Sequence, residues 1–337
     1  IASMRRCCSA LPLRQRIATA TGHCPVASSN ALQCPTIPPM SAPPTHNFQR
    51  GHPWAIPTLL LGMVGICAST LLVRYATDIG PVASAFWRMF LAWPIFAVIA
   101  WRLHSQAERR FSAIAGVAFA ADLSLYHVSI GMTTLANACL LGNLAPVVVT
   151  VLAVWWGTAR GGWRTWTALA VAIAGAVMLV KGSPHAQTPG QLTGDMIAAS
   201  AAFAYAAYQL AATKARNTGG TMAVMATSGL VASLVLLPIA LLHGETIVPA
   251  SLHGWTIVVA LAITGQLLGQ GLVVWSLAHL PPAYSSVALL IQPALVALTA
   301  WPLFDETMVF IQILGGGVLL AGVWWAKHIH SPVKVEG

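Results

Sequence analysis

Residues 54–73 read WAIPTLLLGMVGICASTLLV and contain no charged side chain. A helix needs about 20 consecutive, mostly apolar residues to cross the hydrocarbon core of a bilayer. Further runs of similar length follow along the chain, each too long for a strand and without sustained alternation. We therefore expect ten membrane-spanning helices, near residues 54–73, 81–101, 111–129, 133–156, 163–180, 194–213, 221–242, 254–277, 281–303 and 308–328.

The composition also favours a membrane protein. Only 7% of the 337 residues are charged and 57% are hydrophobic, whereas soluble domains carry roughly 25% charged residues. So few charges cannot cover the surface of a water-soluble fold, but lipid can solvate apolar side chains. Most of the 17 Lys and Arg residues lie in short segments between apolar runs, so nucleic acid is not an expected partner.

The sequence lacks the motifs of cofactor-dependent or metal-dependent enzymes. It contains no Walker loop, no dinucleotide-binding fingerprint and no zinc-protease motif, and its six cysteines lack metal-ligand spacing with histidines. We therefore expect no cofactor and no metal. Energy for any transport is expected to come from a gradient rather than from ATP.

The first 53 residues differ from the rest, because they are rich in Pro, Ser, Thr and Arg and contain no Asp or Glu. We expect a disordered N-terminal extension. It could be a transit peptide, or an upstream extension that is not native, because the chain opens with Ile1 and Met40 would be a sensible start. Residues 329–337 are expected to form a cytoplasmic tail.

The distribution of Lys and Arg predicts the orientation, because cytoplasmic loops carry an excess of these residues. With the N-terminus inside, the predicted outside loops hold only Arg74 and Lys181. One inside loop, residues 278–282, gives no support because it has no Lys or Arg. We expect both termini to be cytoplasmic, with the chain in a bacterial inner membrane.

The two halves of the chain are related. A shift of 147 residues aligns Ser129 with Ser276 and Pro146 with Pro293, with further matches in the same register. Five helices per half is an odd number, so the second half would enter the membrane from the opposite side. Many secondary carriers use such inverted repeats, with the binding site between them. We expect the repeats at residues 54–180 and 194–328.

Several short motifs lie along the predicted spans. They are LANACLLGNLAP at residues 135–146, its counterpart at 285–293, DLSLYH at 122–127, Thr193-Gly194-Asp195 before Tyr205 and Tyr208, and Asp305-Glu306. They resemble, in turn, the fourth and ninth helices, a third-helix motif, the second-repeat start and the acidic pair after helix nine of EamA-type permeases. The equivalent acid in the first half is missing, with Ala159 in its place.

The resemblance covers about residues 54–328 and implies the drug/metabolite transporter superfamily. Its members have ten helices in two inverted repeats around a central cavity and export or exchange metabolites. They carry amino acids, nucleotide derivatives, sugars and drugs, so the resemblance does not fix a substrate.

Two ionisable residues, Asp122 and Arg88, lie within predicted spans, where a charge costs about 2.5–3.5 kcal/mol on insertion scales. Asp122, Tyr126 and Ser129 share one helix face. His127 lies about 140° around the helix from Asp122, although a partner helix could bring it into the same cavity. Asp122 either binds a proton or a cationic substrate group, or forms an ion pair with Arg88. Arg88 could instead snorkel to a headgroup region.

Polar residues precede prolines at matching places in the two halves. Asn137 and Asn143 precede Pro146, and Gln292 precedes Pro293. Proline removes a backbone donor, so bends at these points indicate either a binding site or only the fit of the bundle. Further candidates for the transport path are Tyr205, Tyr208, Gln209, Gln266 and Gln270. Interhelical hydrogen bonds are the alternative role for these side chains.

We therefore expect a secondary active transporter, not an enzyme. It would export or exchange a small organic metabolite such as an amino acid, by alternating access around a central cavity and coupled to protons. The alternatives are a membrane-embedded enzyme that uses Asp122 and His127, or a passive channel. The expected partners are the substrate, membrane lipid and protons, and the oligomeric state stays open.

Overall fold

The computed structural model describes residues 53–105, 107–156, 162–182, 189–216, 220–279, 282–306 and 308–329. Most of these residues are helical, and no described residue lies in a strand. The helices are α3 (Ala55–Tyr75), α4 (Pro81–Arg102), α5 (Arg109–Met132), α6 (Leu135–Gly142), α7 (Ala145–Trp155), α8 (Trp163–Gly182), α9 (Pro189–Arg216), α10 (Thr221–Leu242), α11 (Leu252–Leu261), η2 (Ala262–Gln270), α12 (Gly271–His279), α13 (Pro282–Phe304) and α14 (Phe310–Ile329).

Eight segments of the described chain are long and apolar enough to cross a membrane. They are Ala55–Tyr75, Pro81–Arg102, Arg109–Met132, Leu135–Leu152, Trp163–Lys181, Gly190–Arg216, Thr221–Leu242 and Leu252–Ser276, and α14 adds a shorter apolar helix at Phe310–Trp325. The predicted helical membrane fold is confirmed at this level. The total of ten spans stays a prediction.

Large apolar side chains are exposed along these helices. Leu61 on α3, Val98 on α4, Phe203 on α9 and Leu298 on α13 are each about half exposed or more. Exposed apolar surface of this extent would be a liability in water. In a bilayer, the same side chains contact lipid.

Two predicted spans are not single α-helices. The fourth is divided into α6 and α7 by a turn at Asn143 and Leu144, and Pro146 lies in the first turn of α7. Proline has no N–H to donate, so it is favoured in the first turn of a new helix. The eighth span contains the π-helix η2 between α11 and α12. By contrast, α13 continues through Pro293 without interruption.

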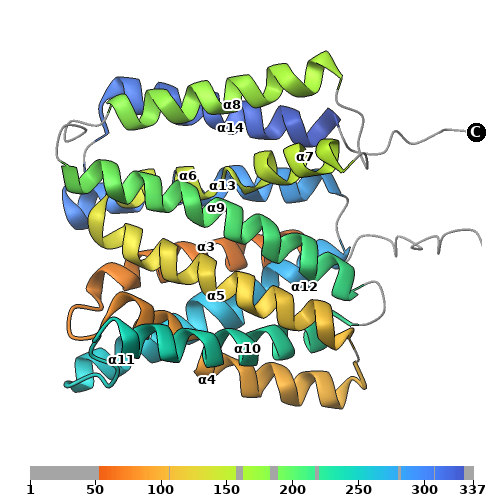
Figure 1. The fold of residues 1–337 in the computed structure, drawn as a ribbon, viewed down its shortest axis with the longest axis vertical. Helices are drawn as coiled ribbons and strands as arrows, with labels where there is room; N and C mark the ends of the chain where they lie inside the picture. The colour runs from red at the N-terminus through yellow and green to blue at the C-terminus, as the bar shows by residue number, and fades with distance from the viewer. Residues whose placement is uncertain are drawn as a thin grey trace, which may run out of the picture. The chain divides into compact units, whose positions relative to one another are not determined.

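The helices pack in a few extensive pairs, α8 with α14, α5 with α9, and α4 with α10. Figure 1 shows α8 and α14 side by side at the top of the view. Glycines allow the backbones of this pair to approach, because a Cβ added at Gly322 would lie 2.4 Å from the Ala172 backbone nitrogen. Most of the other helices line the cavity described below.

Candidate functional site

A cavity of about 630 Å³ lies between helices from both predicted halves of the chain. Its described lining comes from α3, α4, α5, α6, α7, α9, α10, η2, α12 and α13, and from the turn before α7. The pair α8 and α14 contributes no residue to this lining. The cavity is therefore lined by helices of both predicted halves, without the α8–α14 pair.

Ten of the predicted residues line this cavity. They are Arg88, Asp122, Tyr126, Asn143, Pro146, Tyr205, Tyr208, Gln209, Gln270 and Gln292. These residues come from segments far apart in the sequence, and the fold brings them together. The remaining four, His127, Asn137, Gln266 and Pro293, are not among the described lining residues.

Arg88 is a buried cation at the wall of the cavity. Its side chain is 6% exposed, and its Nη2 donates one long hydrogen bond, 3.4 Å, to the Gly265 carbonyl of η2. Its Nε has no hydrogen-bond partner among the described residues. A Cβ added at Gly265 would lie 3.0 Å from the guanidinium carbon, so the absence of a side chain there leaves room for Arg88.

Asp122 lines the same cavity but does not form an ion pair with Arg88. The ion pair in the described part of the chain joins Arg74 and Glu306 instead. The Asp122 carboxylate also accepts no hydrogen bond from a described residue. Because Arg88 and Asp122 face one cavity unpaired, the predicted locking of two helices by this pair is absent from this conformation.

Aromatic and amide side chains surround these two charges. The rings of Tyr205 and Tyr208 stack 5.7 Å apart, and Tyr208 stacks on Phe119 at 4.4 Å. The Tyr205 hydroxyl interacts with Gln209 on its own helix and with Gln270 at the end of η2. The cavity therefore offers neutral donors and acceptors beside one cation and one anion.

His127 lies elsewhere, on the other side of α5. Its Nδ1 is 2.9 Å from the Ser84 hydroxyl oxygen and 3.2 Å from the Pro81 carbonyl, at the start of α4, and its side chain is fully buried. His127 and Asp122 are about 140° apart around α5, so only Asp122 lines the cavity. The structure therefore does not bring together the pair on which the enzyme alternative depended.

Gln266 and Pro293 are outside the cavity for reasons of packing. Gln266 is buried where η2 packs against α3 and α4. Pro293 follows Gln292 by one residue, which turns it about 100° around α13 and away from the lining. Only the first member of the Gln292-Pro293 pair therefore contacts the cavity.

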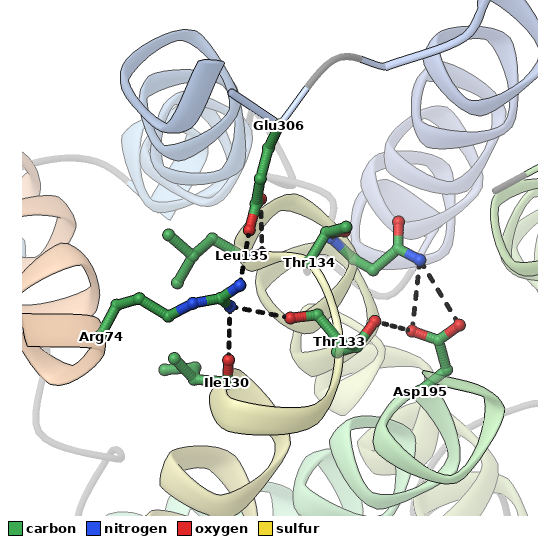
Figure 2. A network of polar contacts seen from close by, with 8 residues as sticks. Arg74, Ile130, Thr133, Thr134, Leu135, Asp195 and Glu306 are labelled. Carbon is green, nitrogen blue, oxygen red and sulfur yellow. Dashed lines mark hydrogen bonds and ion pairs between the residues drawn. The ribbon is translucent and has the colours of Figure 1, made fainter. Parts of the chain in front are cut away.

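Asn137 belongs to a second polar cluster, which includes Arg74, Thr133, Asp195 and Glu306 (Figure 2). Its amide donates to both carboxylate oxygens of Asp195, at 3.2 and 3.4 Å, and the Thr133 hydroxyl donates to Asp195 at 2.5 Å. Gln312 on α14 donates to the Asn137 amide oxygen at 3.4 Å. The cluster thus joins α6, α9 and α14.

Arg74 and Glu306 extend this cluster to α3 and to the segment between α13 and α14. Arg74 lies 3.3 Å from Glu306 and donates to the carbonyls of Ile130 and Thr133, at 2.6 and 3.0 Å. Glu306 accepts from the Leu135 backbone nitrogen at 2.8 Å, where the first N–H groups of α6 lack partners within the helix. Figure 2 shows Arg74 between the end of α5 and Glu306.

The sequence indicates some members of this cluster but not their contacts. Asp195 and the Asp305-Glu306 pair were recognised as family motifs, but no periodicity indicated that they would meet the α5–α6 turn. Asp305, directly before Glu306, has φ 54°, in the left-handed region that short polar residues tolerate. Burial raises the pKa of Glu306 above its ordinary value, opposed by Arg74 and by backbone donors of α6.

The two ends of the cavity differ. At one end, which we call the open end, the lining reaches Thr213, Arg216 and Thr221, of which the first two are exposed. At the other end, the lining stops before the cluster of Arg74, Thr133, Asp195 and Glu306. We call this cluster the closed end, because its contacts join residues of both predicted halves of the chain.

The profile of the EamA-like transporter family matches this chain twice, at residues 53–181 and at residues 192–326. The chain belongs to the EamA-like transporter family. The resemblance predicted from short motifs is therefore confirmed. The family and the apolar helices together make the chain a multi-pass integral membrane protein and a transporter.

Curated relatives of this EamA-like transporter include the threonine/homoserine exporter RhtA of Escherichia coli (strain K12). The two sequences are 28% identical over 226 residues, which cover 66% of this chain and 72% of RhtA. RhtA of Escherichia coli O157:H7 matches with the same values. A crystal structure of a protein with 15% identity matches with a TM-score of 0.55, over 82% of this chain and 99% of the other, which indicates a shared fold.

Proposed function

We propose that this EamA-like transporter is a secondary active exporter of a small α-amino acid, working by alternating access around the cavity that holds Arg88 and Asp122. The observation that carries the proposal is the asymmetry of this cavity. Its lining reaches the exposed residues Thr213 and Arg216 at the open end, whereas at the closed end polar contacts join the two predicted halves, as in one state of an alternating-access cycle. The printed name of the RhtA relatives supports an amino acid as substrate.

The packing of the helices supports two inverted five-helix repeats. If α3 corresponds to α9, and α5 to the run from α11 to α12, then the α5–α9 pair corresponds to the contact of α3 with η2. Likewise, the contact of α6 with α9 corresponds to that of α13 with α3. In the α4–α10 pair and in the α8–α14 pair, each helix packs against its own counterpart in the other half. Such reciprocal pairing is expected of two repeats related by an axis in the membrane plane.

The distribution of basic residues supports an inner-membrane orientation with both termini cytoplasmic. Arg102, Arg109, Arg110, Lys214 and Arg216 are exposed near the open end. In this orientation the open end faces the cytoplasm. The conformation would then be the one that loads substrate for export.

Proton coupling is proposed at Asp122. Among described residues, its carboxylate is influenced by Arg88 from α4, by Tyr126 on its own helix, and by Tyr205 and Tyr208 from α9. None of these groups forms an ion pair with it. A carboxylate in this setting can exchange a proton with whichever end of the cavity is open.

The experiment is transport by the purified protein in proteoliposomes, over a panel of labelled amino acids, nucleosides and sugars, with and without a pH gradient. The proposal predicts saturable movement of a small amino acid that accelerates with the gradient. Movement that does not saturate would indicate a channel instead. Chemical conversion of a substrate without net movement would indicate an enzyme.

A further inference from the structure

We infer that Arg88 and Asp122 together recognise a zwitterion, with the substrate carboxylate on the Arg88 guanidinium and the substrate ammonium on the Asp122 carboxylate. This inference rests on the proposed transport function. It assigns the two charged groups of one α-amino acid to two named side chains of the cavity.

The first reason is that both charges are left unsatisfied by the protein. Arg88 is buried, yet its Nε has no partner and its Nη2 makes only the long contact with the Gly265 carbonyl. A buried charge without partners is costly, so such a group marks a place where a ligand or partner completes the hydrogen bonds. The planar guanidinium suits a carboxylate, which it can bind through two parallel hydrogen bonds.

The second reason is the position of Asp122 in the same cavity. It is partly exposed to the cavity and accepts no hydrogen bond from a described residue. Arg88 and Asp122 carry opposite charges, line one cavity and do not form an ion pair with each other. The carboxylate and ammonium of an α-amino acid are separated by a single carbon. One such molecule can therefore contact both groups at once.

The third reason is charge balance. Apart from Arg216, which is exposed at the open end, the other described lining residues are neutral. A ligand with a single charge would satisfy one of the two groups and face repulsion from the other in a region of low dielectric. A zwitterion complements both. The apolar side chains Met63, Ile66 and Leu123 line the same cavity and can receive a short substrate side chain.

The test measures binding of labelled L-threonine to the purified protein by competition. The competitors are unlabelled L-threonine, L-threonine amide, which lacks the carboxylate, and N-acetyl-L-threonine, which lacks the ammonium. A hydrogen bond to a charged group is worth about 1.5–3 kcal/mol. Each analogue should therefore compete roughly 10- to 100-fold less well than L-threonine with the wild-type protein.

The variants give the decisive result. Arg88→Gln should bind L-threonine and its amide with nearly equal, weakened affinity, while it still discriminates against N-acetyl-L-threonine. Asp122→Asn should show the opposite pattern. Arg88→Lys keeps the charge but loses the paired donors, so it should keep part of the discrimination against the amide. Arg102→Gln, an exposed position on the same helix, is the matched control and should behave as wild type.

Undiminished discrimination against the amide in Arg88→Gln, or against the N-acetyl analogue in Asp122→Asn, would overturn the inference. Saturable transport of another metabolite by the wild type, without competition from any amino acid, would also overturn it, while the carrier function would stand. If the wild type moves no solute of the panel, the proposed function fails and the inference fails with it.

Discussion

Two acidic residues within the spans have opposite surroundings, and this difference assigns them different roles. Asp195 is 2% exposed and accepts hydrogen bonds from Thr133 and Asn137. Asp122 lines the cavity and has neither an ion pair nor a hydrogen bond within the described chain. A satisfied buried group supports the fold, whereas an unsatisfied group in a cavity is available to a ligand.

Asp195→Asn and Asp122→Asn should therefore have separable effects. In Asp195→Asn, an NH₂ group faces donors from Thr133 and Asn137, so the free energy of unfolding should fall by about 1–3 kcal/mol. Asp122→Asn should unfold at nearly the wild-type temperature in detergent but lose transport driven by a pH gradient. If Asp122→Asn is unstable and Arg88→Gln restores its stability, Asp122 is instead a structural partner of Arg88.

The sequence could identify the charged residues of the cavity but not their partners. Helical spacing placed Asp122 and Tyr126 on one face, and both line the cavity. The same spacing could not decide whether His127 would meet that cavity, because the answer depends on which helix packs against α5. Asn137 was assigned to the path, but Asp195 binds it at the closed end. Tertiary contacts between distant segments decide such cases, and periodicity does not report them.

The segment between α13 and α14 contributes Glu306 to the closed end, where it contacts Arg74 and the start of α6. The pKa of Glu306 is raised by burial, which outweighs the opposing effect of Arg74. The protonated form of Glu306 is thus favoured in the closed conformation relative to one in which this side chain is solvated. By linkage, acidification favours closure, and the closed end loosens as the pH rises through the raised pKa.

The predicted direction of this pH dependence can be checked with a cysteine at Thr70, which lines the cavity one turn from Arg74. With the native cysteines replaced, an impermeant thiol reagent added to intact cells should label this position slowly at mildly acidic pH and faster as the pH rises. Thiols react faster at higher pH in any protein, so the same cysteine in Glu306→Gln is the reference. An identical pH profile in both backgrounds would contradict the assignment of closure to Glu306.

The contact of α8 with α14 gives a prediction about packing. A Cβ added at Gly322 would lie 2.4 Å from the Ala172 backbone nitrogen, whereas one added at Gly317 on the same helix meets nothing within 4 Å. Gly322→Ala should therefore lower the free energy of unfolding by roughly 1–3 kcal/mol, as other overpacked contacts do. Gly317→Ala should leave the melting temperature in detergent nearly unchanged. Equal stability of the two variants would show that these helices are not in close contact.

Two elements could not be derived from sequence patterns. An apolar run of 24 residues at 133–156 predicts one helix, but Asn143 caps α6 and Pro146 opens α7. The eighth span packs closely on α3, since a Cβ added at Gly65 of α3 would lie 2.8 Å from the Thr264 carbonyl. The π-helical form of this segment, which packs against α3 and α4, has no composition signal in the sequence.

At the scale of the whole molecule, the proposed orientation predicts which loops face the outside. Cysteines placed at Gln106 and Gly161, in loops with basic residues, should resist an impermeant thiol reagent in intact cells. A cysteine at Gln187 should be labelled. These three positions lie outside the described residues, so the prediction rests on the sequence. The reverse pattern would invert the molecule and make the open end face outward.

We propose that the chain is a carrier whose cavity at Arg88 and Asp122 is reached from one side at a time. The most direct measurement is counterflow in proteoliposomes loaded with excess unlabelled L-threonine and exposed to a trace of labelled L-threonine outside. Alternating access predicts a transient accumulation of label above its equilibrium level, because exit of unlabelled substrate returns the binding site to the outer face. A steady approach to equilibrium without this overshoot would contradict alternating access around the Arg88 and Asp122 cavity.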